Sequence, residues 1–219
     1  VLQHDTYAFG VFETLWQQLG GQIRGGSRRE VISEDAEPAM TWRSRPLGEV
    51  IRSINKFSNN VMTRQLLYTL AAETSGPPGT EAKGLEFVRA YLEKQGLDPA
   101  SLVLDNGAGL SRQTRISAEL LVDVLLLASQ SPHSPEYLAS LSLGGLDGTT
   151  RGRFRRGAVA GNMHVKTGRL DHVSALAGYV HATSGRTYVV VAMLNAPDVH
   201  RGPGEEFQDA IVRWVHELP

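Results

Sequence analysis

The 219-residue chain contains no cysteine. This absence excludes disulfide bonds, cysteine-ligated zinc sites and thiol catalysis, and it leaves the redox compartment open. No apolar run approaches the roughly 20 residues that a membrane-spanning helix needs. The first ten residues show no basic-then-apolar leader, and the chain starts on Val1 rather than on methionine, as expected of a processed product or of an engineered fragment.

Neither sign of charge dominates, because 22 lysines and arginines face 23 acidic residues and the net charge is −1. Nucleic-acid-binding domains usually carry a basic excess, so no nucleic-acid partner is predicted. A local basic run, Arg151, Arg153, Arg155 and Arg156, lies between two glycine-rich loops and is expected to be a solvated turn. The content of 41% apolar and 21% charged residues is typical of a globular core and excludes a wholly disordered chain.

Six histidines are candidate metal ligands: His133, His164, His172, His181, His200 and His216. They have neither the His-Glu-x-x-His spacing of zinc sites nor an accompanying cluster of carboxylates. No metal site is predicted. The segment Asp105-Asn106-Gly107-Ala108-Gly109 lacks both the Gly-Lys-Ser/Thr ending and the G-x-G-x-x-G spacing of nucleotide-binding loops. No organic cofactor is expected either.

Apolar periodicity predicts helices first and strands later in the chain. A helix over 6–19 is expected to bury one face. Further helices are predicted over 46–56, 62–70, 80–95, 117–128, 137–141 and 205–218, and strands over 163–166, 174–182 and 187–194, with a possible short strand at 31–32. Helices followed by antiparallel hairpins and one returning helix predict an α+β layer architecture.

Two tripeptides stand out against this background. Lys166-Thr167-Gly168 ends a predicted strand, and Ser58-Asn59-Asn60 interrupts two predicted helices. Each is common alone, but Ser-x-Asn at a helix junction followed by Lys-Thr-Gly on an edge strand forms two thirds of the signature of serine penicillin-recognising enzymes.

The chemistry of a D-Ala-D-Ala tail accounts for these residue types. Its terminal carboxylate needs a cation and a hydroxyl, which Lys166 and Thr167 can supply, and Gly168 lets a substrate backbone approach the strand. Cleavage of the amide also needs a proton delivered to the leaving nitrogen. Ser58 can relay that proton beside a lysine, and Asn60 can hold neighbouring groups or the substrate amide.

The whole chain resembles the class C low-molecular-mass penicillin-binding proteins, which are D-alanyl-D-alanine carboxypeptidases and endopeptidases. The resemblance rests on both tripeptides, on the segment over 143–149 and above all on Asp105-Asn106-Gly107-Ala108-Gly109-Leu110-Ser111-Arg112. It implies a penicillin-binding transpeptidase/β-lactamase-like fold, α+β or α/β in some schemes, with an antiparallel sheet flanked by helices.

The resemblance also implies roles for single residues. Lys166 and Thr167 would anchor the substrate carboxylate, and the backbone N–H of Arg169 would form half of an oxyanion hole. Arg112 resembles the family arginine that contacts the acidic end of the diaminopimelate side chain of the stem peptide. Asp171 falls where the family has a polar pocket residue, and an acid there would alter the charge that the ligand meets.

The family nucleophile is the serine of a Ser-x-x-Lys at a helix N-terminus. Here that pattern occurs at Ser53-Ile54-Asn55-Lys56, inside a predicted helix and close to Ser58. Such a serine lacks the unsatisfied N–H groups of a helix start, and we rejected it as the nucleophile. Residues 1–219 are therefore expected to form the C-terminal part of the penicillin-binding domain, without the nucleophile-bearing segment and the inserted domains.

The expected partners are a peptidoglycan stem peptide ending in D-Ala-D-Ala, β-lactams and the N-terminal part of the same protein, and the family's substrate implies an extracytoplasmic location. Two other functions stay open from the sequence. One is a non-catalytic peptidoglycan-binding or regulatory module of the same fold, and the other is a β-lactamase or esterase relative.

Overall fold

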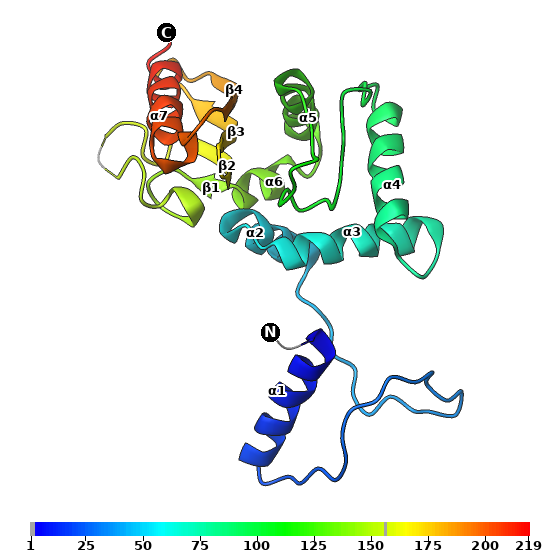
Figure 1. Ribbon diagram of the computed structural model, residues 1–219. Helices are drawn as coiled ribbons and strands as arrows, with labels where there is room; N and C mark the ends of the chain where they lie inside the picture. Colours follow the sequence, from blue (N-terminus) through cyan, green and yellow to red (C-terminus); the bar gives the residue numbers. More distant parts are fainter. Residues whose placement is uncertain (1–2, 156) are drawn as a thin grey trace. The chain divides into compact units, whose positions relative to one another are not determined.

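The computed structural model describes residues 3–155 and 157–219 and divides the chain into two units, Val1–Ser44 and Arg45–Pro219. Each unit is described by itself below. Figure 1 shows the order of the elements along the chain. In the parts that the structure describes, no helix has the length and apolar content needed to cross a membrane.

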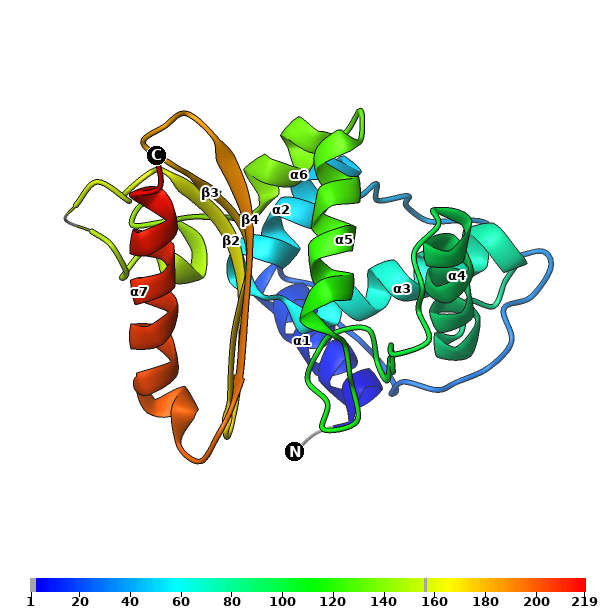
Figure 2. The same ribbon diagram turned by 90° about the horizontal axis from the view of Figure 1, so that it is seen from above.

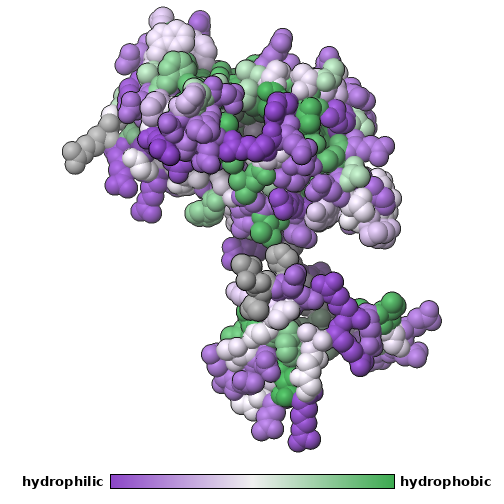
Figure 3. All heavy atoms as spheres, viewed as in Figure 1, coloured by the Kyte–Doolittle hydropathy of each residue, from purple (hydrophilic) through white to green (hydrophobic). Residues whose placement is uncertain are grey.

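The first unit contains one helix, α1 (His4–Gln18), which confirms the helix predicted over 6–19. The prediction that it buries one face was wrong, because Phe12 and Trp16 are 57% and 44% exposed and stack on each other with ring centroids 6.1 Å apart. Hydrophobic side chains are accordingly visible on the surface in Figure 3. The possible strand at 31–32 is also absent, since Val31 and Ile32 are exposed and an unpaired strand is not stable.

The second unit is built on a four-stranded antiparallel sheet. Its strands are β1 (Ser142–Leu143), β2 (Met163–Leu170), β3 (Val173–His181) and β4 (Thr187–Asn195), in the spatial order β1-β2-β3-β4. The three long strands confirm those predicted. Strand β2 is longer than predicted because it pairs with β3 as far as Leu170 with Val173, so Lys166-Thr167-Gly168 lies within the strand and not at its end.

Helices cover both faces of this sheet, as predicted for an antiparallel sheet flanked by helices (Figure 2). Helix α7 (Pro203–His216) packs on one face, where Val165 and Val212 belong to one buried cluster. Helices α2 (Leu47–Phe57), α5 (Ala118–Gln130) and α6 (Ser134–Ser140) lie on the other face, where Leu125 packs on Tyr179. Alternate residues of each strand therefore serve two separate cores.

Two more helices, α3 (Asn60–Ser75) and α4 (Glu81–Lys94), complete the helical side. The hydroxyl of Thr80 accepts from the N–H of Lys83 at the start of α4, and the hydroxyl of Ser117 accepts from the N–H of Leu120 at the start of α5. These caps satisfy N–H groups that the first helical turn leaves free, which is why the predicted starts are close to the observed ones. Two short 3-10 turns, η1 (Gly148–Thr150) and η2 (Val199–Arg201), follow β1 and β4.

The arginine run is not the solvated turn that was predicted. Arg153 is largely buried, with its side chain 11% exposed, and it forms an ion pair with Asp209 of α7. Its guanidinium also lies over the Phe154 ring, 5.7 Å from the ring centroid. Arg151 and Arg155 are exposed, and Arg156 lies outside the described residues. The run therefore fastens the loop after η1 to α7 through one residue.

Candidate active site

The junction between α2 and α3 places Ser58. Helix α2 ends at Phe57, and Ser58 follows in the left-handed conformation with φ 52°. Asn59 then starts α3, its side chain accepting a hydrogen bond of 3.0 Å from the N–H of Met62. This break turns the Ser58 hydroxyl toward β2, where it accepts a hydrogen bond of 2.5 Å from Lys166 Nζ across 108 positions of sequence.

Lys166 is held between two uncharged oxygens. Besides the Ser58 hydroxyl, its ammonium donates to the carbonyl of Thr167 at 2.8 Å. Burial lowers the pKa of Lys166 below its ordinary value, because a low-dielectric surrounding disfavours the charged form. A lysine in this state gives up and takes back a proton nearer to neutral pH than an exposed lysine does.

Thr149 is a site residue that the sequence reasoning did not single out. Its hydroxyl lies 2.7 Å from the hydroxyl of Thr167 and 3.3 Å from that of Ser142. The sequence signal was the segment over 143–149, which entered only as part of the family resemblance. Three hydroxyl groups thus line up from β1 through η1 to β2.

The second half of β2 presents an open edge. The N–H of Gly144 donates to the carbonyl of Met163, so the backbone groups of Met163 point toward β1. Because these groups alternate along an antiparallel strand, those of Thr167 and Arg169 point the same way. Strand β1 reaches only Val165 and His164, so in the described parts of the chain no strand pairs with β2 at Thr167 and Arg169 on this side.

Two further candidate residues, Gly168 and Asn60, make fewer contacts with the rest of the site than Ser58 and Lys166 do. A Cβ at Gly168 would meet the Cβ of Ala175 at 3.6 Å, an ordinary contact, so packing within the chain does not require a glycine there. Asn60 is the first residue of α3, next to Ser58. Its side chain makes no hydrogen bond within the described residues, and the structure gives it no partner in the site.

Arg112 and Asp171 meet at the turn between β2 and β3. Arg112 Nη1 donates to the backbone carbonyl of Asp171 at 2.7 Å, and Nη2 lies 3.7 Å from its carboxylate. The other carboxylate oxygen lies 3.5 Å from Nε2 of His200. The carboxylate of Asp171 is 74% exposed, so the pair presents both a cation and an anion to solvent.

Ser53 lies in the middle of α2, and the lysine of its Ser-x-x-Lys pattern is engaged elsewhere. Lys56 Nζ bonds to Asp147 Oδ2 at 2.5 Å and to the carbonyl of Leu141 at 3.0 Å. Burial raises the pKa of Asp147, but the hydrogen bonds from Lys56 and from the N–H of Leu143 outweigh it and hold the pKa below its ordinary value. Lys56 therefore has a structural partner and is not placed to activate Ser53.

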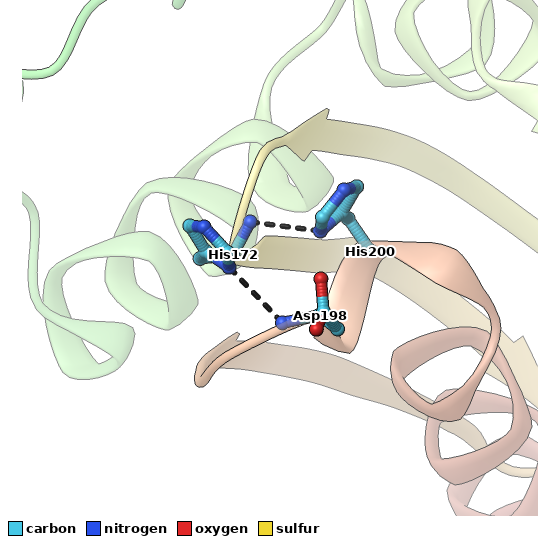
Figure 4. A group of neighbouring side chains, drawn as sticks. All are labelled: His172, Asp198 and His200. Carbon is cyan, nitrogen blue, oxygen red and sulfur yellow. Dashed lines mark hydrogen bonds between the residues drawn. The ribbon is translucent and has the colours of Figure 1, made fainter.

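One group of histidines differs from the sequence expectation. His172 and His200 do have an accompanying carboxylate, Asp198, with potential ligand atoms within 4.8 Å of one another (Figure 4). The ring of His164 packs edge-to-face on that of His181, with centroids 5.6 Å apart, and its Nδ1 lies 3.1 Å from the carbonyl of Leu138. Burial lowers the pKa of His164.

Known proteins resemble this chain in both sequence and structure. The model of the D-Ala-D-Ala carboxypeptidase 3 (S13) family matches residues 1–218. The chain is 36% identical over 184 residues to a D-alanyl-D-alanine carboxypeptidase of Actinomadura sp. (strain R39), covering 81% of this chain and 33% of the relative. The chain thus spans about a third of the length of that curated relative.

Solved structures share the fold. Penicillin-binding protein 4 (dacB) of Haemophilus influenzae, solved in complex with a β-lactam, superposes with a TM-score of 0.86 at 22% identity, over 100% of this chain and 52% of that one. A class A β-lactamase representative of Bacteroides cellulosilyticus superposes with a TM-score of 0.59 at 16% identity, over 78% of this chain and 62% of that one. These likenesses confirm the predicted penicillin-binding/β-lactamase-like fold.

Proposed function

Because the chain belongs to the D-Ala-D-Ala carboxypeptidase 3 (S13) family, we propose that it is part of a serine-type D-Ala-D-Ala carboxypeptidase or endopeptidase that acts on peptidoglycan stem peptides. The observation that carries this proposal is the bond between Lys166 and Ser58 beside the open edge of β2. β-Lactams would react at the same site.

In this proposal Lys166 and Thr167 bind the terminal carboxylate of the substrate. A cation and a hydroxyl on adjacent residues suit a carboxylate, and hydrogen bonds to a charged group are the strong ones. The hydroxyl of Thr149 orients that of Thr167 by accepting or donating one hydrogen bond. Thr149 therefore acts as a positioning residue for the anchor.

The substrate backbone would lie along β2 as an added strand. The backbone N–H of Arg169, on the open edge, would donate to the oxyanion that forms on the scissile carbonyl, and Gly168 leaves room for the approach. Ser58 would pass a proton between Lys166 and the leaving nitrogen. Asn60 would contact the substrate amide or the side chains around it.

Arg112 and Asp171 would meet the diaminopimelate side chain of the stem peptide. They lie at the end of β2 beyond Arg169, which is the direction in which an added strand would continue. Since Asp171 is paired with Arg112, the ligand would meet both charges rather than a free cation.

The reaction itself needs a serine that we place outside residues 1–219. The oxygen of that serine would attack the carbonyl of the penultimate D-Ala, D-Ala would leave with the relayed proton, and water would then hydrolyse the acyl-enzyme. The N-terminal part of the same protein would supply this segment, with residues 1–219 as the C-terminal part of the domain. An extracytoplasmic location follows from a peptidoglycan substrate.

The proposal is tested with the complete protein that contains this chain. It should release D-Ala from a stem peptide ending in D-Ala-D-Ala, and Ser58→Ala should reduce kcat by about 10²- to 10⁴-fold, the range for loss of a proton-transferring group. Thr63→Ala, which removes an exposed helical hydroxyl bonded only to the carbonyl of Asn59, serves as the matched control. Equal rates for Ser58→Ala and Thr63→Ala would contradict the proposal.

A further inference from the structure

The turn between β2 and β3 is fastened to the segment before α7 by two histidine rings (Figure 4). The turn consists of Asp171 and His172, and its partners are Asp198 and His200 at η2. His172 and Asp198 both have positive φ, 64° and 56°. Residues other than glycine adopt this conformation only where surrounding contacts hold it, so these contacts determine the shape of the turn.

Each of the two histidine rings accepts a backbone hydrogen bond at its Nδ1 atom. The N–H of Asp198 donates to Nδ1 of His172 at 3.0 Å, and the N–H of His172 donates to Nδ1 of His200 at 2.8 Å. A backbone N–H can only donate, so each Nδ1 must carry a lone pair. A neutral imidazole with an unprotonated Nδ1 carries its hydrogen on Nε2. The backbone thus selects one tautomer at both residues.

This tautomer argues against a metal ion at the cluster, although its atoms are close enough for one. A metal at Nε2 would need a lone pair there, but Nε2 carries the hydrogen. A metal at Nδ1 would displace the two backbone hydrogen bonds and face their N–H groups. Ligand histidines usually show the opposite arrangement, with the non-ligating nitrogen donating to an oxygen.

We propose that His172 and His200 are positioning residues that hold the β2–β3 turn in place only while both rings are neutral. A protonated ring carries hydrogens on both nitrogens and cannot accept. Protonation would therefore set N–H against N–H at each contact. Acid that protonates the rings would therefore release the turn.

The released turn would affect the site through Asp171. Arg112 is bound to the carbonyl of Asp171, and the N–H of Ala196 donates to the carbonyl of His172 at 3.1 Å. Loss of the two histidine contacts would leave the turn held by these bonds and by the strands. The effect on substrate handling rests on the function proposed above, whereas the effect on the turn does not.

Several charged side chains lie near the rings of His172 and His200. Asp171 lies 3.5 Å from Nε2 of His200 and is also paired with Arg112, and Asp198 is paired with Arg201 at 3.3 Å. Beyond them, Arg169 of β2 pairs with Glu205 of α7 at 3.4 Å.

The first test reads the tautomers directly in the 219-residue chain. Long-range ¹H–¹⁵N correlation spectra at pH 8 should place the hydrogen on Nε2 in both His172 and His200. The protection factors of the N–H groups of His172 and Asp198, which are the intrinsic exchange rates divided by the observed rates, should then fall at least tenfold between pH 8 and 5.5. A hydrogen on Nδ1 of either ring would overturn the proposal.

Substitutions at position 200 distinguish the effect of losing the hydrogen-bond acceptor from the effect of losing the imidazole ring. Asparagine puts an acceptor oxygen where Nδ1 stands, one bond from Cγ, and glutamine puts its polar atoms near the place of Nε2. His200→Asn should keep the N–H of His172 protected at pH 8 and reduce its acid-induced exposure, because only the ring of His172 can then be protonated, while His200→Gln should lose protection at both pH values. Position 200 is the cleaner choice, because asparagine at 172 would also gain from its tolerance of positive φ.

His133→Asn is the matched control, since His133 is an exposed histidine remote in sequence from the turn. It should leave the exchange of both N–H groups unchanged at either pH. The same acid-induced exposure in His200→Asn as in the wild type would overturn the proposal. Stabilisation of the wild type by equimolar Zn²⁺ that His200→Asn abolishes would also overturn it, in favour of a metal site.

The functional consequence is measured separately in the complete protein. KM for a stem peptide should rise severalfold between pH 8 and 5.5 in the wild type and rise less in His200→Asn, which keeps only the acid-sensitive contact of His172, with kcat affected alike in both. An equal rise in both proteins would overturn the positioning role. If the complete protein releases no D-Ala at all, the proposed function fails while the exchange experiment still decides the turn.

Discussion

The central residue of the site is a lysine without a carboxylate partner. Within the described residues, Lys166 donates to the hydroxyl of Ser58 and to the carbonyl of Thr167, whereas Lys56 is paired with Asp147. Lys166 is partly buried, and a partly buried ammonium that lacks a counter-ion is costly. The cost is reduced by an anion that arrives from outside. This is the physical reason to expect a carboxylate ligand at Lys166.

The carboxylate contact gives the first prediction. In the complete protein, Lys166→Ala should reduce kcat/KM for a peptide ending in D-Ala-D-Ala by roughly ten- to a hundredfold, because a hydrogen bond to a charged group contributes about 1.5–3 kcal/mol. The same peptide with a C-terminal amide is the control, since it lacks the charge. An equal loss on the acid and the amide would show that Lys166 does not read the carboxylate.

The lowered pKa of Lys166 gives the second prediction. The folded state releases this proton at a lower pH than the unfolded state does, so the free energy of unfolding should rise with pH up to the ordinary lysine value of about 10.4. Lys166→Met has no such proton. Chemical denaturation from pH 7 to 10 should therefore show that its stability relative to the wild type falls as the pH rises, and a constant difference would contradict the assignment.

At the scale of single residues, the sequence identified which residues to expect in the candidate site better than it identified the hydrogen bonds between them. Ser58 and Lys166 were found because each belongs to a short contiguous motif, but their hydrogen bond depends on a left-handed residue at a helix junction, which no periodicity reveals. Thr149 was missed as a site residue because its role arises only when η1 folds back onto β2. The predicted roles are untested and stay predictions for all of the candidate residues: Ser58, Asn60, Lys166, Thr167, Gly168, Arg169, Arg112 and Asp171.

At the scale of elements, polar contacts fix how the helices meet the sheet. The ion pair of Lys56 with Asp147 joins α2 to the turn after β1, close to the Ser58 junction. Asp147→Asn should destabilise the chain by about 1–2 kcal/mol at pH 7, since Lys56 is mostly buried while Asp147 is partly exposed and screened. Because the pKa of Asp147 is lowered, this contribution is present above about pH 4 and is lost as the pH falls through the folded-state value.

Denaturation at pH 7 and pH 3 measures this prediction. The difference between Asp147→Asn and the wild type should shrink at the lower pH. Glu30→Gln is the control, because Glu30 forms an exposed pair with Arg28 that should contribute under about 1 kcal/mol. A difference for Asp147→Asn that is unchanged at pH 3 would show that the charge of Asp147 is not what stabilises the junction.

The ion pair of Arg153 with Asp209 supports a fourth prediction. Arg153→Ala leaves a largely buried carboxylate, which typically costs about 3–5 kcal/mol, and here the cost should lie near the lower end because Arg213 is 3.8 Å from the other oxygen. Arg151→Ala, at an exposed position of the same run, should change the stability by less than about 0.5 kcal/mol. Thermal unfolding of the two variants side by side compares them, and similar losses would contradict the anchoring role.

Most elements followed from the sequence because caps and periodicity agree with the final packing. Thr80 and Ser117 cap the helices that they were expected to start, and the hairpin strands alternate as period-two patterns do. Two expectations depended on partners that a local pattern does not contain. The apolar face of α1 has no element of its own unit to bury it, and Val31-Ile32 has no strand to pair with.

At the scale of the whole molecule, the chain holds part of a catalytic set. The residues proposed to anchor a carboxylate and to relay a proton lie together with the open strand edge in the unit Arg45–Pro219. The lysine of the Ser-x-x-Lys pattern at Ser53 is paired with Asp147, and the chain spans about a third of the length of its curated relative. Our account therefore assigns substrate recognition to this chain and the nucleophile to the rest of the protein.

Intact-mass spectrometry after incubation with a penicillin tests this assignment most directly. The 219-residue chain should keep its mass, and the complete protein should gain the mass of one penicillin molecule by acylation. A penicillin adduct on the 219-residue chain would contradict the account, and peptide mapping would then show whether Ser53 carries it.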